Sequence, residues 1–476
     1  MKFTTIQRAL ATTILLLVVS TSFAQKLWTM EECINTALSG NIQIKQQQLN
    51  AELTRQHKQQ SVASLFPSLN GSATYVYNYG QTIDPYTNQF ASARTQSNNF
   101  YLSSSITVFN GFQLLNTIFQ RGLDYKASLY DLDKMKNDVS LGVATAYLQV
   151  LYNSELKDIA TSQLAITKQQ VDRMQKLYDA GSVAKGSLLT LQAQQASEEY
   201  QLVNAQNQLV LSYITLSQLM ELPTADGLEI VKPTLANPDA SSLLSKPEEI
   251  FNKALTIQPE IKSAEIKLQS AKKGVCIAWG SISPNLTLNG SWGTGYSGAS
   301  KEISSVSQSG LIPIGSTSGG EIVYAPTYSY EYATKSFNDQ IKSNENKSIG
   351  LYLNVPIFNK WQSKTAIATA KISYKNYEYQ LQATKNQLSK AIQQAFADAL
   401  GALNRYDAAS KSVDALQESF KYTEQKYNVG MVNATDYNDA KNKLAKSQSD
   451  LLQAKYEYVF RLTVLDFYQG RPLKLN

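Results

Sequence analysis

The stretch Tyr427-Asn-Val-Gly-Met-Val-Asn-Ala-Thr-Asp436 has a degraded counterpart earlier in the chain, Tyr178-Asp-Ala-Gly-Ser-Val-Ala-Lys-Gly-Ser187. Each stretch is typical of a tight turn around a glycine, Gly181 or Gly430, inside a long run of helical apolar spacing. Upstream of each turn about 70 residues pass without a proline, which predicts a helix on the order of 100 Å long. An ordinary globular core has no need of such helices.

The two turns belong to an internal repeat. Tyr178 and Tyr427 are 249 positions apart, and the same interval separates further identical residues: Phe109 and Phe358, Gly181 and Gly430, Val183 and Val432, Leu202 and Leu451, Leu216 and Leu465. Earlier in each copy the interval is 217, as between Pro67 and Pro284. The second copy has therefore gained the difference, 32 residues, and the Ser/Gly/Tyr-rich stretch 297–343 is the expected place.

The repeat divides the chain into two similar halves. Residues 1–24 are predicted to be a Sec signal peptide, because basic residues precede an apolar run that ends in a small-x-small cleavage site. We then expect a first repeat over 25–223, a proline-containing linker over 224–247 and a second repeat over 248–476. Each repeat should contain a helix, a β-hairpin and a long helical hairpin, with β-hairpins at 68–108 and 285–357 and helical tips near 181 and 430.

Alternating residues in the two β-hairpins predict strands that cross a membrane. Ile349, Leu351 and Leu353 alternate with polar or small residues in a strand of roughly ten residues, the length that a tilted strand needs to span a bilayer. A small soluble sheet would alternate too, but Tyr and Trp gather near the strand ends, as at a membrane interface. The polar segments 81–97 and 297–343 are predicted to be extracellular loops. Because four strands cannot enclose a lumen and an open sheet edge is not viable in lipid, we expect an oligomer.

Composition and motifs argue against catalysis and nucleic-acid binding. The net charge of +6 is small for 476 residues and no long basic run occurs, so nucleic acid is not expected as a partner. His57 is the only histidine, and no metal-ligand spacing, P-loop or Gly-x-Ser-x-Gly motif is present, so we expect no enzyme activity, no cofactor and no metal. Cys33 and Cys276 make no disulfide framework.

The order of these features resembles the TolC family of outer-membrane efflux proteins. The resemblance is carried by the opening Trp28 to Ile34, the Val-Phe-Asn-Gly and Val-Pro-Ile-Phe-Asn strand ends, the Tyr-x-x-Gly tips and the stretch Leu216 to Pro223. It implies an α+β membrane protein, a homotrimer whose chains supply four strands each to a twelve-stranded transmembrane β-barrel continued by a long periplasmic α-helical barrel. It also implies contact with outer-membrane lipid and two protein partners, a periplasmic adaptor (membrane fusion) protein and an inner-membrane pump of RND or ABC type.

The resemblance further implies the exit duct of a tripartite efflux or type I secretion system, which conducts substrates passively across periplasm and outer membrane. Two alternatives stay open. A general porin or adhesin leaves the long helices unexplained, and a periplasmic coiled-coil scaffold leaves the strands unexplained. Because such a duct is wide, we expect the pump to select the substrate.

Two groups of candidate site residues follow. The tips are expected to dock the adaptor, through Ala180, Gly181, Ser182, Val183, Val429, Gly430, Met431 and Val432. The alternative is that the glycines serve only a positive-φ turn. Asp436 and Asp439 are three apart, so they share a helix face.

The resemblance implies that copies of Asp436 and Asp439 ring a cation-selective periplasmic gate, as charged rings do in channels. The first repeat offers Ser187 and Thr190 instead. The best-studied member of the family has an arginine where Val432 stands and an aspartate where Ser187 stands. We therefore expect the closed state to rest on packing and polar contacts. The alternative is a solvated acidic pair favoured by the helix dipole.

Overall fold

The computed structural model describes residues 27–84, 86–91, 94–233, 237–239 and 246–473. The predicted signal peptide lies outside the described residues, as does part of the predicted linker. The chain forms two compact units. Unit 1 comprises residues up to 54, 124–268 and 377–476, and unit 2 comprises 55–123 and 269–376. Each unit draws on both halves of the sequence.

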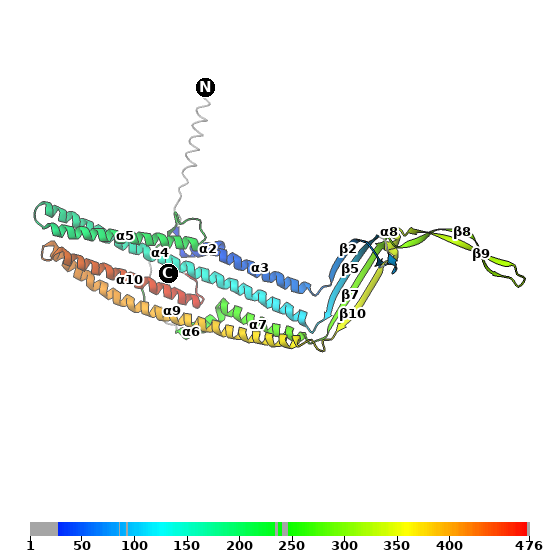
Figure 1. The fold of residues 1–476 in the computed structure, drawn as a ribbon. Helices are drawn as coiled ribbons and strands as arrows, with labels where there is room; N and C mark the ends of the chain where they lie inside the picture. The colour runs from blue at the N-terminus through cyan, green and yellow to red at the C-terminus, as the bar shows by residue number, and fades with distance from the viewer. Residues whose placement is uncertain (1–26, 85, 92–93, 234–236, 240–245, 474–476) are drawn as a thin grey trace, which may run out of the picture. The chain divides into compact units, whose positions relative to one another are not determined.

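Helices account for most of the described chain (Figure 1): α2 (Met30–Gly40), α3 (Ile42–Ala63), α4 (Gln113–Asp179), α5 (Lys185–Leu219), α6 (Pro247–Ile257), α7 (Pro259–Gly280), α8 (Phe337–Ser343), α9 (Gln362–Asn428) and α10 (Ala434–Tyr468). Helices α4 and α9 have 67 residues each, and α5 and α10 have 35 each. At 1.5 Å per residue, the longer pair reaches about 100 Å. None of the helices in the described ranges is long and apolar enough to cross a membrane.

The single helix predicted before the first β-hairpin is in fact two helices, α2 and α3, which meet at Asn41. The Asn41 side-chain oxygen accepts the backbone N–H groups of Gln43 at 2.9 Å and Ile44 at 3.2 Å. An asparagine that caps a new helix competes with continuation of the old one. Gln258 and Pro259 mark the corresponding break between α6 and α7.

The core of unit 1 is built where the short helices lie against the long ones. Val143, Tyr147 and Leu151 of α4 pack in one buried cluster with residues of α2, α5 and α10. The short parallel strands β1 (Leu27–Trp28) and β6 (Glu229–Ile230) border this cluster. The Tyr147 hydroxyl ties this strand pair to α4, because it lies 2.7 Å from the carbonyl of Val231 and 3.2 Å from that of Trp28.

Unit 2 contains one antiparallel sheet of four strands in the order β10-β7-β5-β2. Its strands are β2 (Ser68–Asn78), β5 (Thr95–Phe109), β7 (Asn285–Ser297) and β10 (Asn346–Asn354). These strands fall in the segments 68–108 and 285–357, except that β5 ends one residue later, at Phe109. In the described chain, β2 and β10 each pair on one side only, so the sheet has two open edges.

The two segments predicted to be extracellular loops contain secondary structure that was not predicted from the sequence. Between β2 and β5 lie the short strands β3 (Thr82–Ile83) and β4 (Phe90–Ala91). Between β7 and β10 lie a long hairpin, β8 (Lys301–Ser316) and β9 (Ile322–Thr334), and helix α8. The Ser- and Gly-rich composition hid the period-two pattern of tyrosines from 324 to 332.

Candidate functional site

The four-stranded sheet has one apolar and one polar face. Residues directly opposite each other in an antiparallel sheet share a face, and neighbours along a strand alternate. By this register, one face carries Leu69, Phe100, Leu102, Ile106, Leu286, Leu288, Trp292, Ile349, Leu351 and Leu353. The other carries mainly Ser, Asn, Thr and Gly: Asn70, Ser72, Thr74, Ser103, Ser105, Thr107, Thr287, Asn289, Ser291, Ser348, Gly350 and Asn354.

Side-chain hydrogen bonds link neighbouring strands on the polar face. Ser105 donates to the Asn289 side chain at 2.7 Å, and the Ser291 and Ser348 hydroxyls lie 2.7 Å apart. On the apolar face of the edge strand, Ile349 is 81% exposed and Leu351 is 65% exposed. A sheet with an exposed aliphatic face and a hydrogen-bonding opposite face can separate lipid on one side from water on the other.

The two helical tips share one backbone design. Gly181 has φ +71° and Gly430 has φ +77°, a region that favours glycine. The residue after each glycine donates its N–H five positions back, Ser182 to Leu177 and Met431 to Lys426, both at 2.8 Å. These bonds close the ends of α4 and α9 as Schellman-type turns.

The tips also present side chains to solvent. Val429 is 71% exposed and Met431 is 73% exposed, while Ala180 and Ser182 are exposed and Val183 and Val432 are half-buried. A Cβ atom added to either glycine would meet open space. The glycines are therefore required by backbone conformation, and the surface around them is free for contact in the described chain.

Asp436 and Asp439 lie at the start of α10, directly after the second tip. Both are exposed, on the side of the helix opposite the buried Tyr437 and Asn438. The Asn433 side chain caps α10 by accepting the Asp436 N–H at 2.9 Å. Lys443, one turn after Asp439, pairs with its carboxylate at 2.7 Å, a partner that sequence reasoning missed. In the described residues no group of three or more His, Cys, Asp or Glu side chains could hold a metal ion.

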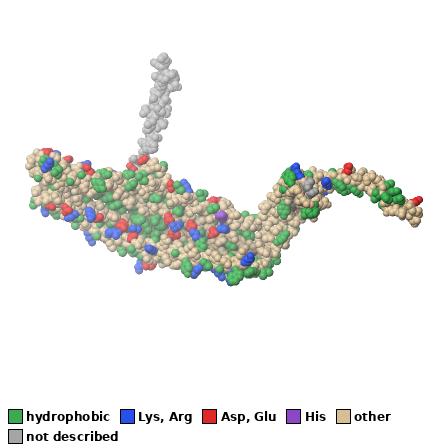
Figure 2. All heavy atoms as spheres, in the orientation of Figure 1, with side chains coloured by type: hydrophobic (Ala, Val, Ile, Leu, Met, Phe, Trp, Pro, Cys, Tyr) green, Lys and Arg blue, Asp and Glu red, His purple; other side chains and the backbone are tan. Residues whose placement is uncertain are grey.

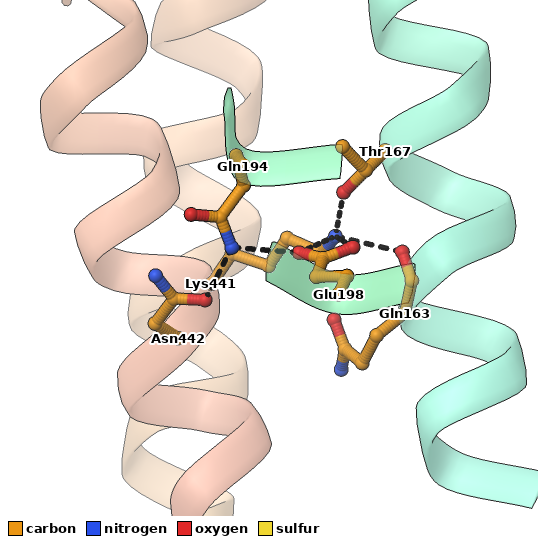
Figure 3. Close-up of polar contacts among 6 residues, drawn as sticks. All are labelled: Gln163, Thr167, Gln194, Glu198, Lys441 and Asn442. Atoms are coloured by element: carbon orange, nitrogen blue, oxygen red, sulfur yellow. Dashed lines mark hydrogen bonds and ion pairs between the residues drawn. The ribbon is translucent and has the colours of Figure 1, made fainter. Parts of the chain in front are cut away.

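A buried ion pair lies one turn further along α10 (Figure 3). The Lys441 ammonium is 3.0 Å from Glu198 Oε1 and 3.2 Å from Oε2, and the two side chains are only 2% and 4% exposed. Lys441 also donates to the Gln163 carbonyl at 2.8 Å and to the Thr167 hydroxyl. Burial lowers the pKa of Lys441, and the Glu198 carboxylate opposes that shift.

The network around this pair joins three helices from both halves of the chain. Gln163 and Thr167 belong to α4, Glu198 to α5 and Lys441 to α10. Gln194 extends it, donating to Glu198 at 2.8 Å and to Asn442 at 3.0 Å. Beside it lies a groove of about 530 Å³ lined mainly by Gln, Asn, Ser and Ala side chains of α4, α5 and α10.

Two further contacts tie the helical hairpins together on either side of this network. Near the tips, the Arg173 guanidinium of α4 donates to the Asn428 carbonyl at 3.3 Å and also bonds its side chain. Farther along, the Tyr456 hydroxyl of α10 donates to the Glu155 carboxylate of α4 at 2.5 Å. The first helical hairpin, α4 with α5, is thus held to the second, α9 with α10, by a series of polar contacts.

The sequence did carry a signal for the buried pair. Leu191, Glu198, Ala205 and Ser212 are buried at heptad spacing on α5, so Glu198 occupies a core position of the helix pair. The residue at the equivalent place in the second repeat is Ser447, which is also buried and bonds Ser412 at 2.9 Å. A charge at a heptad core position predicts a buried partner.

Comparisons with known proteins agree with this architecture. Residues 33–221 and 250–471 match the family described as outer membrane efflux protein. The outer membrane protein TolC of Vibrio cholerae is 24% identical over 69% of this chain and 66% of its own length. The pyoverdine export outer membrane protein OpmQ of Pseudomonas aeruginosa is 29% identical over 36% of this chain and 35% of its own length. Among solved structures, the outer membrane protein VceC of Vibrio cholerae superposes with a TM-score of 0.73 at 16% identity, covering 93% of this chain and 96% of that one.

The family match extends through both long helical hairpins and both β-hairpins, which make up most of the described chain. The curated relatives are named as outer membrane proteins, one of them as an export protein, and this chain is likewise an outer-membrane protein. This chain belongs to the outer membrane efflux protein family.

Proposed function

We propose that this chain is the outer-membrane exit duct of a tripartite efflux or type I secretion system. It conducts substrates passively from an inner-membrane pump of RND or ABC type, through a periplasmic adaptor protein, to the outside of the cell. The observation that carries the proposal is the four-stranded sheet with one apolar face, one Ser/Asn/Thr face and two open edges.

The open edges support a homotrimer. An unpaired strand edge in lipid leaves backbone N–H and C=O groups without partners, each at a cost of several kcal/mol. Pairing β10 of one copy with β2 of the next removes both edges. Three copies supply twelve strands, enough for an aqueous lumen behind the polar faces, whereas eight strands would fill with side chains.

The tips support contact with the adaptor. Val429 and Met431 offer exposed apolar side chains at the end of a long helical hairpin, beside a turn whose conformation only glycine adopts without strain. An adaptor helical hairpin could cover these side chains. Asp436 and Asp439, exposed just behind the tip, are proposed to ring the periplasmic opening when copies assemble.

The buried pair of Lys441 and Glu198 is proposed to hold the periplasmic end closed. Moving α10 away from α4 and α5 would break the ion pair together with the hydrogen bonds that Lys441 donates to Gln163 and Thr167, so opening carries a cost in free energy. Binding of an adaptor at the tips is the expected source of that free energy.

The test is a deletion strain complemented with the wild-type gene or with a tip variant. Loss of an exit duct should raise intracellular accumulation of several dyes and drugs, and wild-type protein should restore export. Loss of a general porin would lower drug uptake instead. A periplasmic scaffold would not be found as a trimer in the outer-membrane fraction. Reduced accumulation in the deletion strain would overturn the proposal.

A further inference from the structure

The hairpin of β8 and β9 belongs to unit 2 but is not part of its four-stranded sheet. Its strands pair only with each other in the described chain and form a separate sheet. Every residue of β8 is exposed, and so are eleven of the thirteen residues of β9, all but Ala325 and Thr327. It occupies the stretch where the repeat intervals place the 32 residues gained by the second copy. Figure 1 shows it running out past α8 as a bare ribbon of two strands.

The register gives this hairpin one apolar face. Directly paired residues share a face, so the register places these apolar residues on one side: Ile303, Val306, Leu311, Pro313, Ile322, Tyr324, Pro326, Tyr328, Tyr330 and Tyr332. Gln308 and Ser316 interrupt this side, and Lys301 and Thr334 border it at the base. The opposite side carries Glu302, Ser305, Ser307, Thr327, Ser329 and Glu331, with Ile312 and Val323 near the turn. Hydrophobic side chains are visible along the hairpin in Figure 2.

This apolar face is too large to be left in water. Its four tyrosines are 49–61% exposed, and Ile303, Val306, Leu311 and Ile322 are 52–60% exposed. Eight side chains of that kind, each about half exposed, offer roughly 600–800 Å². The largest apolar patch on a typical monomer is about 300–600 Å², and a stable interface buries about 800 Å² per partner. A lone two-stranded hairpin is also marginally stable in water.

We propose that the apolar face of the β8–β9 hairpin packs against the same face of the other copies of this chain. The three hairpins would thus form a bundle at the outer end of the barrel. The inference rests on the proposed trimer.

The connection of the hairpin to the open sheet edge favours another copy of this chain as the partner that covers its apolar face. The chain enters the hairpin from β7 and returns through α8 to β10, whose free edge needs a strand from a neighbouring copy. Closing the edges therefore brings the copies of the hairpin around one opening.

The distribution of charged residues on the hairpin also favours another copy of this chain as the partner. Apart from Lys301 at the base, the apolar face carries no charged residue, so identical faces meet without repulsion. Glu302 and Glu331 on the other face and Glu321 in the turn stay in solvent. The same acidic residues disfavour an anionic lipid surface as the occupant.

Cysteine cross-linking of the full-length protein tests this packing. In a Cys276→Ser background, Tyr330→Cys places a thiol on the apolar face, and Ser329→Cys places one at the neighbouring position on the polar face. Because a disulfide needs Cβ atoms about 4 Å apart, Tyr330→Cys should give roughly tenfold more covalent oligomer than Ser329→Cys after mild oxidation.

The mass of the complex, measured by light scattering in detergent, separates the two proposals. If the native mass is that of a trimer but Tyr330→Cys shows no covalent oligomer on denaturing gels, or no more than Ser329→Cys, the hairpin bundle is overturned and the proposed duct is not. A monomer overturns both. Quenching of a fluorophore on Tyr330→Cys by brominated lipid would show a lipid-covered face and would also overturn the bundle.

Discussion

The Lys441 ammonium lies 3.0 Å from the Glu198 carboxylate, in a site where neither side chain is more than 4% exposed. The pair joins α10 to α5, and through Thr167 and Gln163 to α4. Two charges removed from water repay their desolvation only when geometry and additional hydrogen bonds are good, as they are in this network. The pair therefore fixes the position of α10 relative to α4 and α5.

Breaking this pair from one side should destabilise the helical unit strongly. Glu198→Gln leaves the Lys441 charge buried without its partner, which is expected to cost about 3–5 kcal/mol of unfolding free energy. Lys443→Met removes the exposed partner of Asp439 and should cost under about 0.5 kcal/mol. Thermal unfolding of the purified variants measures the difference, and equal losses would refute a special role for the buried pair.

Burial of the Tyr437 hydroxyl predicts that the folded protein loses stability at alkaline pH. Tyr437 is 1% exposed, its ring stacks on Tyr427 at 4.5 Å, and its hydroxyl finds no hydrogen-bond partner among the described residues. Burial raises the pKa of Tyr437 to about 12 from 10. The pKa of Tyr437 is higher in the folded chain than in the unfolded chain. The contribution of the neutral hydroxyl to folding stability is therefore complete below pH 10 and is lost as the pH rises toward 12.

Tyr437→Phe should therefore leave stability at pH 7 nearly unchanged and reduce the loss of stability between pH 8 and pH 11 by roughly 1–1.5 kcal/mol. Tyr422→Phe, at a site 56% exposed, is the control and should not alter the alkaline loss. Denaturant unfolding at pH 8 and pH 11 measures both. A large loss for Tyr437→Phe at pH 7 would show that the hydroxyl has a partner after all.

Bulky residues at the tip glycines should stop export without preventing assembly. Gly430→Trp adds both backbone strain and volume at the proposed docking surface, whereas Gly227→Trp adds the same strain at φ +74° in an equally open turn elsewhere. Dye efflux from cells should fall to the level of the deletion strain for Gly430→Trp and Gly181→Trp and stay near normal for Gly227→Trp. Normal efflux in both tip variants would rule out docking at the tips.

The proposed gate predicts opposite effects of two substitutions on ion selectivity. Replacing Asp436 and Asp439 together by Ala should abolish cation preference and block by trivalent cations in single-channel recordings. Lys443→Ala frees Asp439 from its 2.7 Å ion pair and should raise cation preference. Unchanged selectivity in both variants would leave the aspartates as a solvated pair at a helix start.

Periodicity predicted the long helices and four strands because these elements repeat one simple pattern over many residues. It failed where a single side chain decides the structure. The Asn41 side-chain oxygen accepts the Gln43 N–H and so caps a new helix, and spacing alone cannot distinguish such a residue from a polar residue on a helix surface. The β8–β9 hairpin was missed because its polar face is made of the same Ser, Thr and Gly residues that mark loops.

The candidate site was predictable only in part, for a similar reason. The two turns were visible in the sequence because each contains a glycine, and the structure has both glycines at positive φ. The roles assigned to the tips and to Asp436 stay predictions. Glu198 and Lys441 are 243 positions apart, and each looks like an ordinary charged helix residue until its heptad position is noted. Their pairing is a property of the packed helices.

Cross-linking between the two sheet edges tests the central claim that copies of this chain close one channel. Within one sheet β2 and β10 are three strand spacings apart, about 14 Å, so a disulfide between them can form only between copies. The measurement pairs Leu351→Cys with a cysteine at each position from 70 to 74 in turn, in a Cys276→Ser background. At least one pairing should give covalent dimers and trimers on a denaturing gel and no larger species. Monomers alone at every pairing, or a ladder extending beyond the trimer, would contradict that claim.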